Sequence, residues 1–313
     1  DRADPDELVR LADGLADARE WAKVEELRER CREAVERGRQ LWGVAHWCTY
    51  RIAHGAPPEL AAAQLSEPRS ALLPGPITEI LGVRHSWADL AEHLPVSPER
   101  SVVAHERGIR GESIPEGEVD LSVVEIPIGP ESWEGPYAPV EYGSGGGTFD
   151  PPELPAMEAV DLGAGEPMED EAADALFDLS KSWLAESAGR AETRCVEGTV
   201  RDAIGSFGLK QARLAEVPAG VAMSWMAWLG ASGGAYGTRK GGAAGRASAW
   251  WTLAVLTGLD DQWPDFDGLA EAAGELNWYV WNDLAPDTGW VVRLGVEDPL
   301  DGLAWALMAV DAR

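Results

Sequence analysis

The chain has 313 residues, 45% of them apolar, and a formal net charge of -28 at neutral pH. This length suits one large domain or two ordinary ones, and the apolar fraction is enough for a buried core. The charge repels nucleic-acid phosphates and anionic membrane surfaces, so we expect no general nucleic-acid binding and no membrane binding. No apolar run reaches the roughly 18 to 20 residues that cross a bilayer, which favours a soluble protein.

The three cysteines are Cys31, Cys48 and Cys195. They are widely spaced and form no C-x-x-C pair, so they indicate neither a disulfide framework nor a zinc site. A reducing, cytoplasmic location is therefore predicted. The 15 tryptophans are expected near the edge of the core, where the indole N–H finds a partner.

Residues 1–111 carry the pattern of consecutive short helices. The clearest is REWAKVEELRERCREAVERG at 19–38, where apolar residues recur every three to four positions before Gly38. Helical patterns at 6–18 and 40–55 flank it with short links, which predicts antiparallel hairpins similar to HEAT or tetratricopeptide arrays. No fixed-period repeat is present, and whether these helices form a separate domain stays open.

Residues 112–167 are predicted to be an acidic connection rich in Pro and Gly. Between residues 109 and 180 one basic residue, Arg110, stands against 18 acidic ones. Within it VDLSVVEIPI, at 119–128, predicts a short strand. Such a segment marks a domain boundary, and a long loop packed along a surface is the alternative.

Residues 168–313 are predicted to form an α+β domain, so the fold class of the chain is α+β. A mixed, mostly antiparallel sheet is expected to pack on a Gly-rich helix pair. The expected helices are 168–190, 219–231, 239–259 and 265–276, and the expected strands are 192–200, 210–217, 276–284, 288–298 and 303–312. The final segment, LAWALMAVDA, is also compatible with a terminal helix.

The segment GGAYGTRKGGAAGRASAWW, at 233–251, gathers three cations among glycines. It is not a P-loop, because Gly241 follows Lys240 where a Ser or Thr is required. On a helix, Gly241, Gly245 and Ala249 are spaced by four residues and make a strip almost without side chains. This strip predicts a close helix crossing.

Arg239, Arg246 and Trp250 lie on another face of that predicted helix. Two guanidiniums beside an indole can hold a carboxylate or a phosphate. Together with Lys240 they are the candidate ligand-binding residues. The alternative is an ion-pair network with the protein's own carboxylates.

The other motifs in the sequence indicate neither a metal site nor a catalytic site. The histidines show neither H-x-x-x-H nor HExxH spacing, and the aspartates of LDDQWPDFD are interrupted by Pro264. No metal site and no cofactor are predicted. No G-x-S-x-G elbow is present, so no catalytic residue is assigned.

Three segments, REWAKVEELRERCREAVERGRQLW, YGTRKGGAAGRASAWW and GWVVRLGVEDPLDGLAWAL, resemble a group of uncharacterised actinobacterial proteins that carry a domain of unknown function. The resemblance covers most of the chain. It implies no reaction and no catalytic residues.

Two hypotheses follow. The first is an interaction or ligand-binding protein without a recognisable catalytic motif, whose partner is another protein or an anionic small molecule. The second is an enzyme acting on a phosphate- or carboxylate-bearing small molecule held by Arg239 and Arg246. The sequence does not decide whether the protein is an enzyme.

Overall fold

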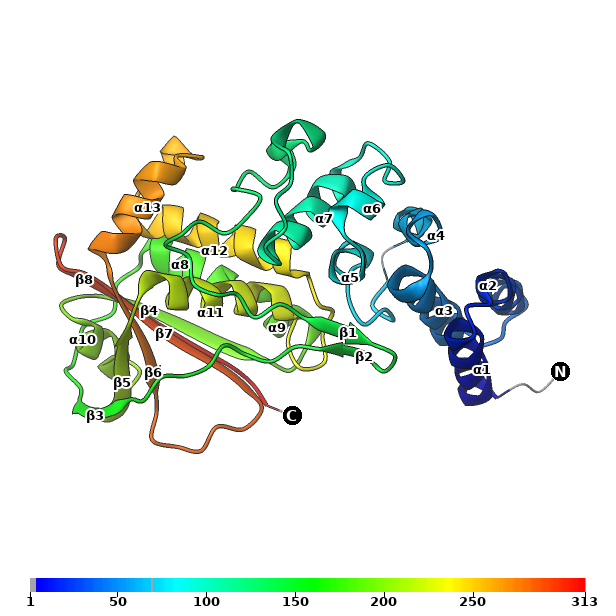
Figure 1. The fold of residues 1–313 in the computed structure, drawn as a ribbon. Helices are drawn as coiled ribbons and strands as arrows, with labels where there is room; N and C mark the ends of the chain where they lie inside the picture. The colour runs from blue at the N-terminus through cyan, green and yellow to red at the C-terminus, as the bar shows by residue number, and fades with distance from the viewer. Residues whose placement is uncertain (1–3, 69, 313) are drawn as a thin grey trace. The chain divides into compact units, whose positions relative to one another are not determined.

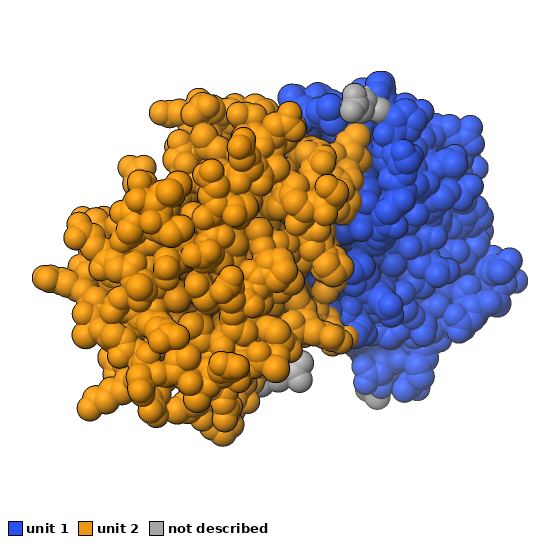
Figure 2. Space-filling view, turned by 60° about the vertical axis from the view of Figure 1, so that its left-hand side comes forward, with its two compact units in different colours: residues 1–123, 139–149 blue, residues 124–138, 150–313 orange. Residues whose placement is uncertain are grey.

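The computed structural model describes residues 4–68 and 70–312 and shows an α+β protein with helices at its N-terminus, as predicted (Figure 1). The chain forms two compact units (Figure 2). The helical unit comprises residues 1–123 and 139–149, and the sheet unit comprises residues 124–138 and 150–313. The backbone therefore passes three times from one unit to the other.

The helical unit contains seven α-helices among its described residues. They are α1 (Pro5–Asp17), α2 (Trp21–Glu36), α3 (Trp42–Gly55), α4 (Pro58–Ala62), α5 (Ile77–Arg84), α6 (Trp87–Leu90) and α7 (Pro98–Ile109). Short 3-10 turns η1 (Ala63–Ser66), η2 (Glu116–Glu118) and η3 (Leu121–Val123) accompany them, with the hairpin β1 (Glu141–Gly143) and β2 (Gly146–Thr148).

The three-to-four-residue periodicity of 19–38 produces the core of this unit. Val24 and Cys31 of α2 are buried in one cluster with Cys48 and Ile52 of α3. Gly38 follows α2 with a φ of +84°, a left-handed conformation that glycine adopts without strain. Periodicity and helix stop together fix this helical hairpin.

The β1–β2 hairpin is tied into the helical unit by buried hydrogen bonds. The Tyr142 hydroxyl donates to Glu79 of α5 over 2.8 Å, and His54 Nε2 lies 2.9 Å from the Tyr142 carbonyl oxygen. Burial lowers the pKa of His54, despite the hydrogen bond to that carbonyl. The hairpin thus belongs to the helical unit although residues 110–140 separate it from α7.

The sheet unit is built on six strands in the order β3-β5-β6-β7-β8-β4, with every neighbouring pair antiparallel. The strands are β3 (Glu158–Asp161), β4 (Arg190–Glu197), β5 (Gln211–Val217), β6 (Asn277–Asn282), β7 (Trp290–Asp298) and β8 (Leu303–Asp311). Its helices are α8 (Glu171–Asp178), α9 (Lys181–Glu186), α10 (Val200–Gly205), α11 (Ala219–Ser232), α12 (Gly242–Leu256) and α13 (Phe266–Glu275), with the turn η4 (Asp260–Gln262).

Side chains alternate between two differently covered faces of this sheet. On one face α11 covers the sheet and carries α12 packed against it, and Trp228 of α11 lies 5.2 Å, ring centre to ring centre, from Trp290 of β7. On the other face Ile204 of α10 packs with Trp281 and Ala306. Both faces of the central strands are therefore buried, which explains their nearly continuous apolar sequences.

Two local expectations are wrong. The segment 119–128 is not a strand: it contains the 3-10 turn η3. The helix expected at 168–190 is two helices, α8 and α9, and the Ser180 hydroxyl donates to the Phe177 carbonyl where they part. The strand expected at 303–312 is confirmed as β8, which pairs along its whole length with β7 and β4, so the alternative of a terminal helix falls away.

The boundaries 1–111, 112–167 and 168–313 stay a prediction. None of the helices within residues 4–68 and 70–312 has the length and apolarity that crossing a membrane requires.

Candidate functional site

The glycine strip of 233–251 forms a close helix crossing, as predicted. A Cβ atom on Gly245 would lie 2.2 Å from the carbonyl oxygen of Ala227 and 2.6 Å from the Cβ of Ala231, both on α11. Gly241 lies outside the helix as its N-cap, with a φ of +102°. Only glycine at 245 lets the two backbones approach this closely.

Arg246 is fully buried and pairs with a carboxylate of the protein itself. Its Nε donates to Glu134 Oε2 over 2.8 Å, and its Nη2 donates to Glu134 Oε1 over 2.6 Å. In addition, Nη1 donates to the Pro127 carbonyl oxygen and Nη2 donates to the Gly129 carbonyl oxygen. For Arg246, the structure matches the alternative of an internal ion pair.

Glu134 is the centre of this cluster. Trp250 Nε1 donates to its Oε2 over 3.1 Å, the Tyr137 hydroxyl donates to the same oxygen, and the backbone N–H of Glu131 donates to Oε1 over 2.7 Å. Burial alone raises the pKa of Glu134, but the hydrogen bonds and the charge of Arg246 outweigh burial, so its pKa is lowered. The ion pair holds segment 124–138 on α12.

The other two predicted ligand residues lie before α12. Arg239 is buried, with 8% of its surface exposed. Lys240 Nζ pairs with Glu186 of α9 and lowers the pKa of that carboxyl. Lys240 lines a groove of about 340 Å³ that also contains Lys181, Ser182 and Ser248. Arg246 and Trp250 do not line this groove, so the four residues do not form one site.

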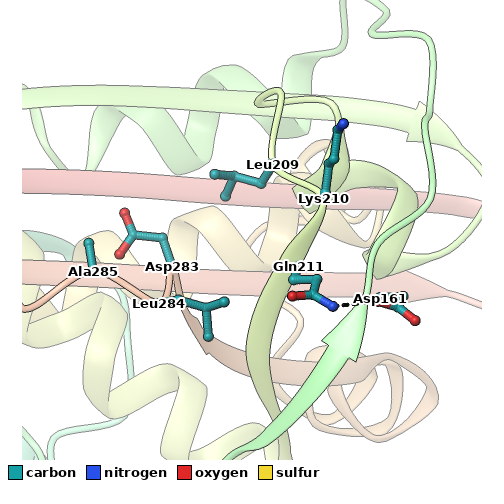
Figure 3. A pocket seen from close by; sticks show the side chains of 7 residues that line it. All are labelled: Asp161, Leu209, Lys210, Gln211, Asp283, Leu284 and Ala285. Atoms are coloured by element: carbon teal, nitrogen blue, oxygen red, sulfur yellow. Dashed lines mark hydrogen bonds between the residues drawn. The ribbon is translucent and has the colours of Figure 1, made fainter.

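A larger concavity, the β5–β6 pocket, opens where these two strands separate (Figure 3). It has a volume of about 620 Å³ and is lined by Asp161, Leu209, Lys210, Gln211, Asp283, Leu284 and Ala285. Leu284 extends from the loop after β6 toward β5, and Leu209 extends toward that loop (Figure 3). Leu284 is 48% exposed, and the pocket combines an apolar floor with a charged rim.

The register of the sheet explains why the pocket opens here. β5 pairs with β6 from Arg213 to Val217 only, while its earlier residues Gln211 and Ala212 pair only with β3. Beyond Asn282 the chain therefore leaves β5. Pro286 lies in the connection that follows and cannot donate to a ladder.

A buried arginine braces the loop that forms one wall of the pocket. Arg293 of β7, whose side chain is 6% exposed, pairs with Asp283 over 2.9 Å and with Asp287 over 2.7 Å. Asn282 Nδ2 also donates to Asp287, over 2.8 Å. The guanidinium carbon lies 5.6 Å from the centre of the Trp281 ring. The wall is therefore fixed by charge and by stacking.

The rim of the pocket carries two carboxylates and one ammonium group. Asp161 accepts a hydrogen bond from Gln211 Nε2 over 2.8 Å, which leaves its second oxygen available. None of these residues was predicted to belong to a site. The signal in the sequence is the Pro and Gly of the β6–β7 connection, which indicate a long loop at a strand end.

The protein is of the α+β class: a helical N-terminal region precedes an antiparallel sheet with a Gly-rich helix pair. The chain belongs to a family of unknown function, DUF6183, whose model matches residues 6–296. Membership of a family of unknown function was predicted and is confirmed, while the actinobacterial origin stays a prediction. Comparison with curated proteins and with solved structures gives no significant match.

Proposed function

We propose that this is a binding protein, and that the β5–β6 pocket receives an apolar side chain of a partner protein that has a basic group beside it. Leu209 and Leu284 supply the apolar contact, and Asp161 supplies an acceptor at the rim, while Asp283 is paired with Arg293. The pocket volume of about 620 Å³ falls within the range of pockets that enclose ligands. A half-exposed leucine facing such a concavity is the observation that carries the proposal.

The expected contribution of Leu284 follows from its exposure. Full burial of a leucine is worth about 1.5–3 kcal/mol. Because Leu284 is already about half buried, its remaining contribution on binding is about 1 kcal/mol, which corresponds to roughly a fivefold change in affinity.

The test is selection of peptides from a displayed random library on the immobilised protein, followed by titration of the enriched peptides. Leu284→Ser is expected to weaken binding about fivefold. The matched control is Leu300→Ser in the β7–β8 turn, where leucine is 77% exposed and does not line the pocket. Asp161→Asn is expected to weaken peptides that carry Lys or Arg more than neutral ones.

Equal affinities for the Leu284→Ser and Leu300→Ser variants would show that the peptides bind elsewhere. Enrichment of peptides without an apolar residue would also contradict the proposal.

The second candidate is the enzyme or binding site for a phosphate- or carboxylate-bearing small molecule. The observation that favours it is the groove of Lys240, where Lys181 and two serine hydroxyls stand together and the Ser182 Oγ is buried with no hydrogen-bond partner among the described residues. Arg239 would act as a neighbouring cation. Arg246 is buried and paired with Glu134, whereas Lys240 lines the groove, so an anion would bind at Lys240 and compete there with Glu186.

Inorganic phosphate and citrate are the probes for this second candidate. A concentration-dependent rise in melting temperature that is lost in Lys240→Ala and kept in the control Lys210→Ala would support it. No rise in the unmodified protein would argue against it, and turnover of an anionic substrate would decide whether the site is catalytic.

A further inference from the structure

Strand β4 is one edge of the six-stranded sheet. It pairs with β8 along its whole length, from Arg190 to Glu197. On its outer side the only bridge among the described residues is at Cys195, whose carbonyl oxygen accepts from the Met168 N–H over 2.9 Å. Another strand could therefore pair with the outer side of β4 at residues before Cys195, whereas Met168 already occupies the position beside Cys195.

The Met168 bridge also fixes which peptide groups of β4 face outward. The N–H and C=O of one strand residue point to the same side, and successive residues alternate. Since Cys195 faces outward, Ala191 and Thr193 do as well. In agreement, Gly198 directs its N–H inward and donates to Gly302 beside β8, over 2.8 Å. The outward N–H groups of Ala191 and Thr193 have no acceptor within the described ranges.

The side chains at this edge alternate in charge. Arg190 is exposed and has no ion-pair partner among the described residues. Glu192, with 44% of its side chain exposed, pairs with Arg194 of its own strand and with no other cation in the described part of the chain. Both Arg190 and Glu192 lie on the sheet face that α10 partly covers, opposite Val310 and Met308 of β8. An uncompensated cation on a chain of charge -28 thus stands two residues from a carboxylate.

We propose that β4 pairs antiparallel with β4 of a second copy of this chain, with the twofold axis between the two Ala191 residues. In this register Arg190 faces Glu192 of the partner subunit, and Glu192 faces Arg190 of the partner subunit. Unlike charges then stand directly opposite each other twice. The two six-stranded sheets become one continuous sheet.

Hydrogen bonding selects this register over its neighbours. The two Ala191 residues exchange N–H and C=O, and each Thr193 N–H meets the carbonyl oxygen of Gly189 of the partner subunit. The Gly189 N–H is already used, since it donates to Trp183 over 3.1 Å, so this pair needs only one bond. A twofold axis at Thr193 would place the partner's Ala191 against Cys195, where Met168 already lies.

The experiment is sedimentation equilibrium of the full chain over a concentration series at 0.15 M salt, where the Debye length of about 8 Å screens the general repulsion between acidic copies. The unmodified protein is expected to show a monomer–dimer equilibrium. Thr193→Pro removes two intersubunit hydrogen bonds without touching the ladder to β8, and is expected to weaken the dimer about 30-fold. The matched control Thr193→Val keeps the N–H and the shape and should dimerise normally.

Charge exchange tests the register. Arg190→Glu or Glu192→Arg alone places like charges together and should dissociate the dimer, whereas R190E/E192R in one chain restores unlike pairs and should restore it. Circular dichroism establishes that each variant is folded. A monomer at all concentrations, a dimer that survives Thr193→Pro, or a double variant that stays monomeric would each overturn the proposal. Leu284→Ser should leave the dimer unchanged, which separates this result from the peptide-binding test.

Discussion

The helix crossing at Gly245 gives the sharpest test of the fold. In Gly245→Ala the new methyl group would lie 2.2 Å from the Ala227 carbonyl oxygen, about 1 Å inside van der Waals contact. The obstacle is backbone of α11, so relief requires the helices to separate. At the matched position Gly230 of α11, a methyl group would lie 3.4 Å from both the Gly245 Cα and the Ser248 Cβ. There the contact is tight but adjustable.

Both substitutions gain helix propensity, and they differ in the free energy lost to overpacking. Alanine stabilises a helix over glycine by about 1 kcal/mol. Overpacking costs about 1–3 kcal/mol, and a clash with backbone falls at the upper end of that range. We therefore expect Gly245→Ala to lose about 2 kcal/mol of unfolding free energy, which is a melting temperature lower by about 4–8 °C. Gly230→Ala should melt within about 2–4 °C of the unmodified protein.

Thermal unfolding followed by circular dichroism and by calorimetry measures both variants. Equal melting temperatures for Gly245→Ala and Gly230→Ala would refute this explanation, because they would show that the helix crossing does not require a glycine at position 245.

Three further outcomes are expected. Arg246→Met leaves the Glu134 carboxylate buried without a counter-charge and should lower the unfolding free energy in urea by about 3–5 kcal/mol; adding Glu134→Gln should recover part of the loss. Burial lowers the pKa of His54, so below the unfolded-state pKa of about 6.5 the unfolded chain binds more protons than the folded chain, and the protein loses stability as the pH decreases. Between pH 7.5 and 5 the melting temperature of His54→Gln should therefore decrease less than that of the unmodified protein. Burial raises the pKa of Cys48 and Cys195 to about 12, so the native protein should not react with a disulfide reagent at pH 8, whereas the unfolded chain should titrate as three thiols.

Features that depend on neighbouring residues were predictable from the sequence. The period of 19–38 predicts α2, the apolar run in 288–298 predicts β7, and the spacing of Gly245 and Ala249 predicts the close crossing. The break between α8 and α9 was missed, because the apolar period continues through Ser180 while its hydroxyl bonds to the backbone.

Features that depend on distant residues were not predictable. The Arg246 guanidinium meets a carboxylate 112 residues earlier in the chain, and nothing near either residue signals the other among so many acidic side chains. The β5–β6 pocket depends on where two strands cease to pair, which is a property of the register. The sequence indicated the charged groups at 239–250 as candidate ligand residues, but it did not indicate that Glu134 and Glu186 are their ion-pair partners.

The sheet unit is discontinuous along the chain, because segment 124–138, which carries Glu134, belongs to it while residues 139–149 do not. A fragment that starts at residue 168 would lack both Glu134 and strand β3, so it would carry an orphaned guanidinium and a bare β5. A single recombination point cannot transfer this unit whole, because its two segments are separated by residues 139–149 of the helical unit. Proteolytic cleavage at any one of the three crossings would leave the two units joined by the remaining two.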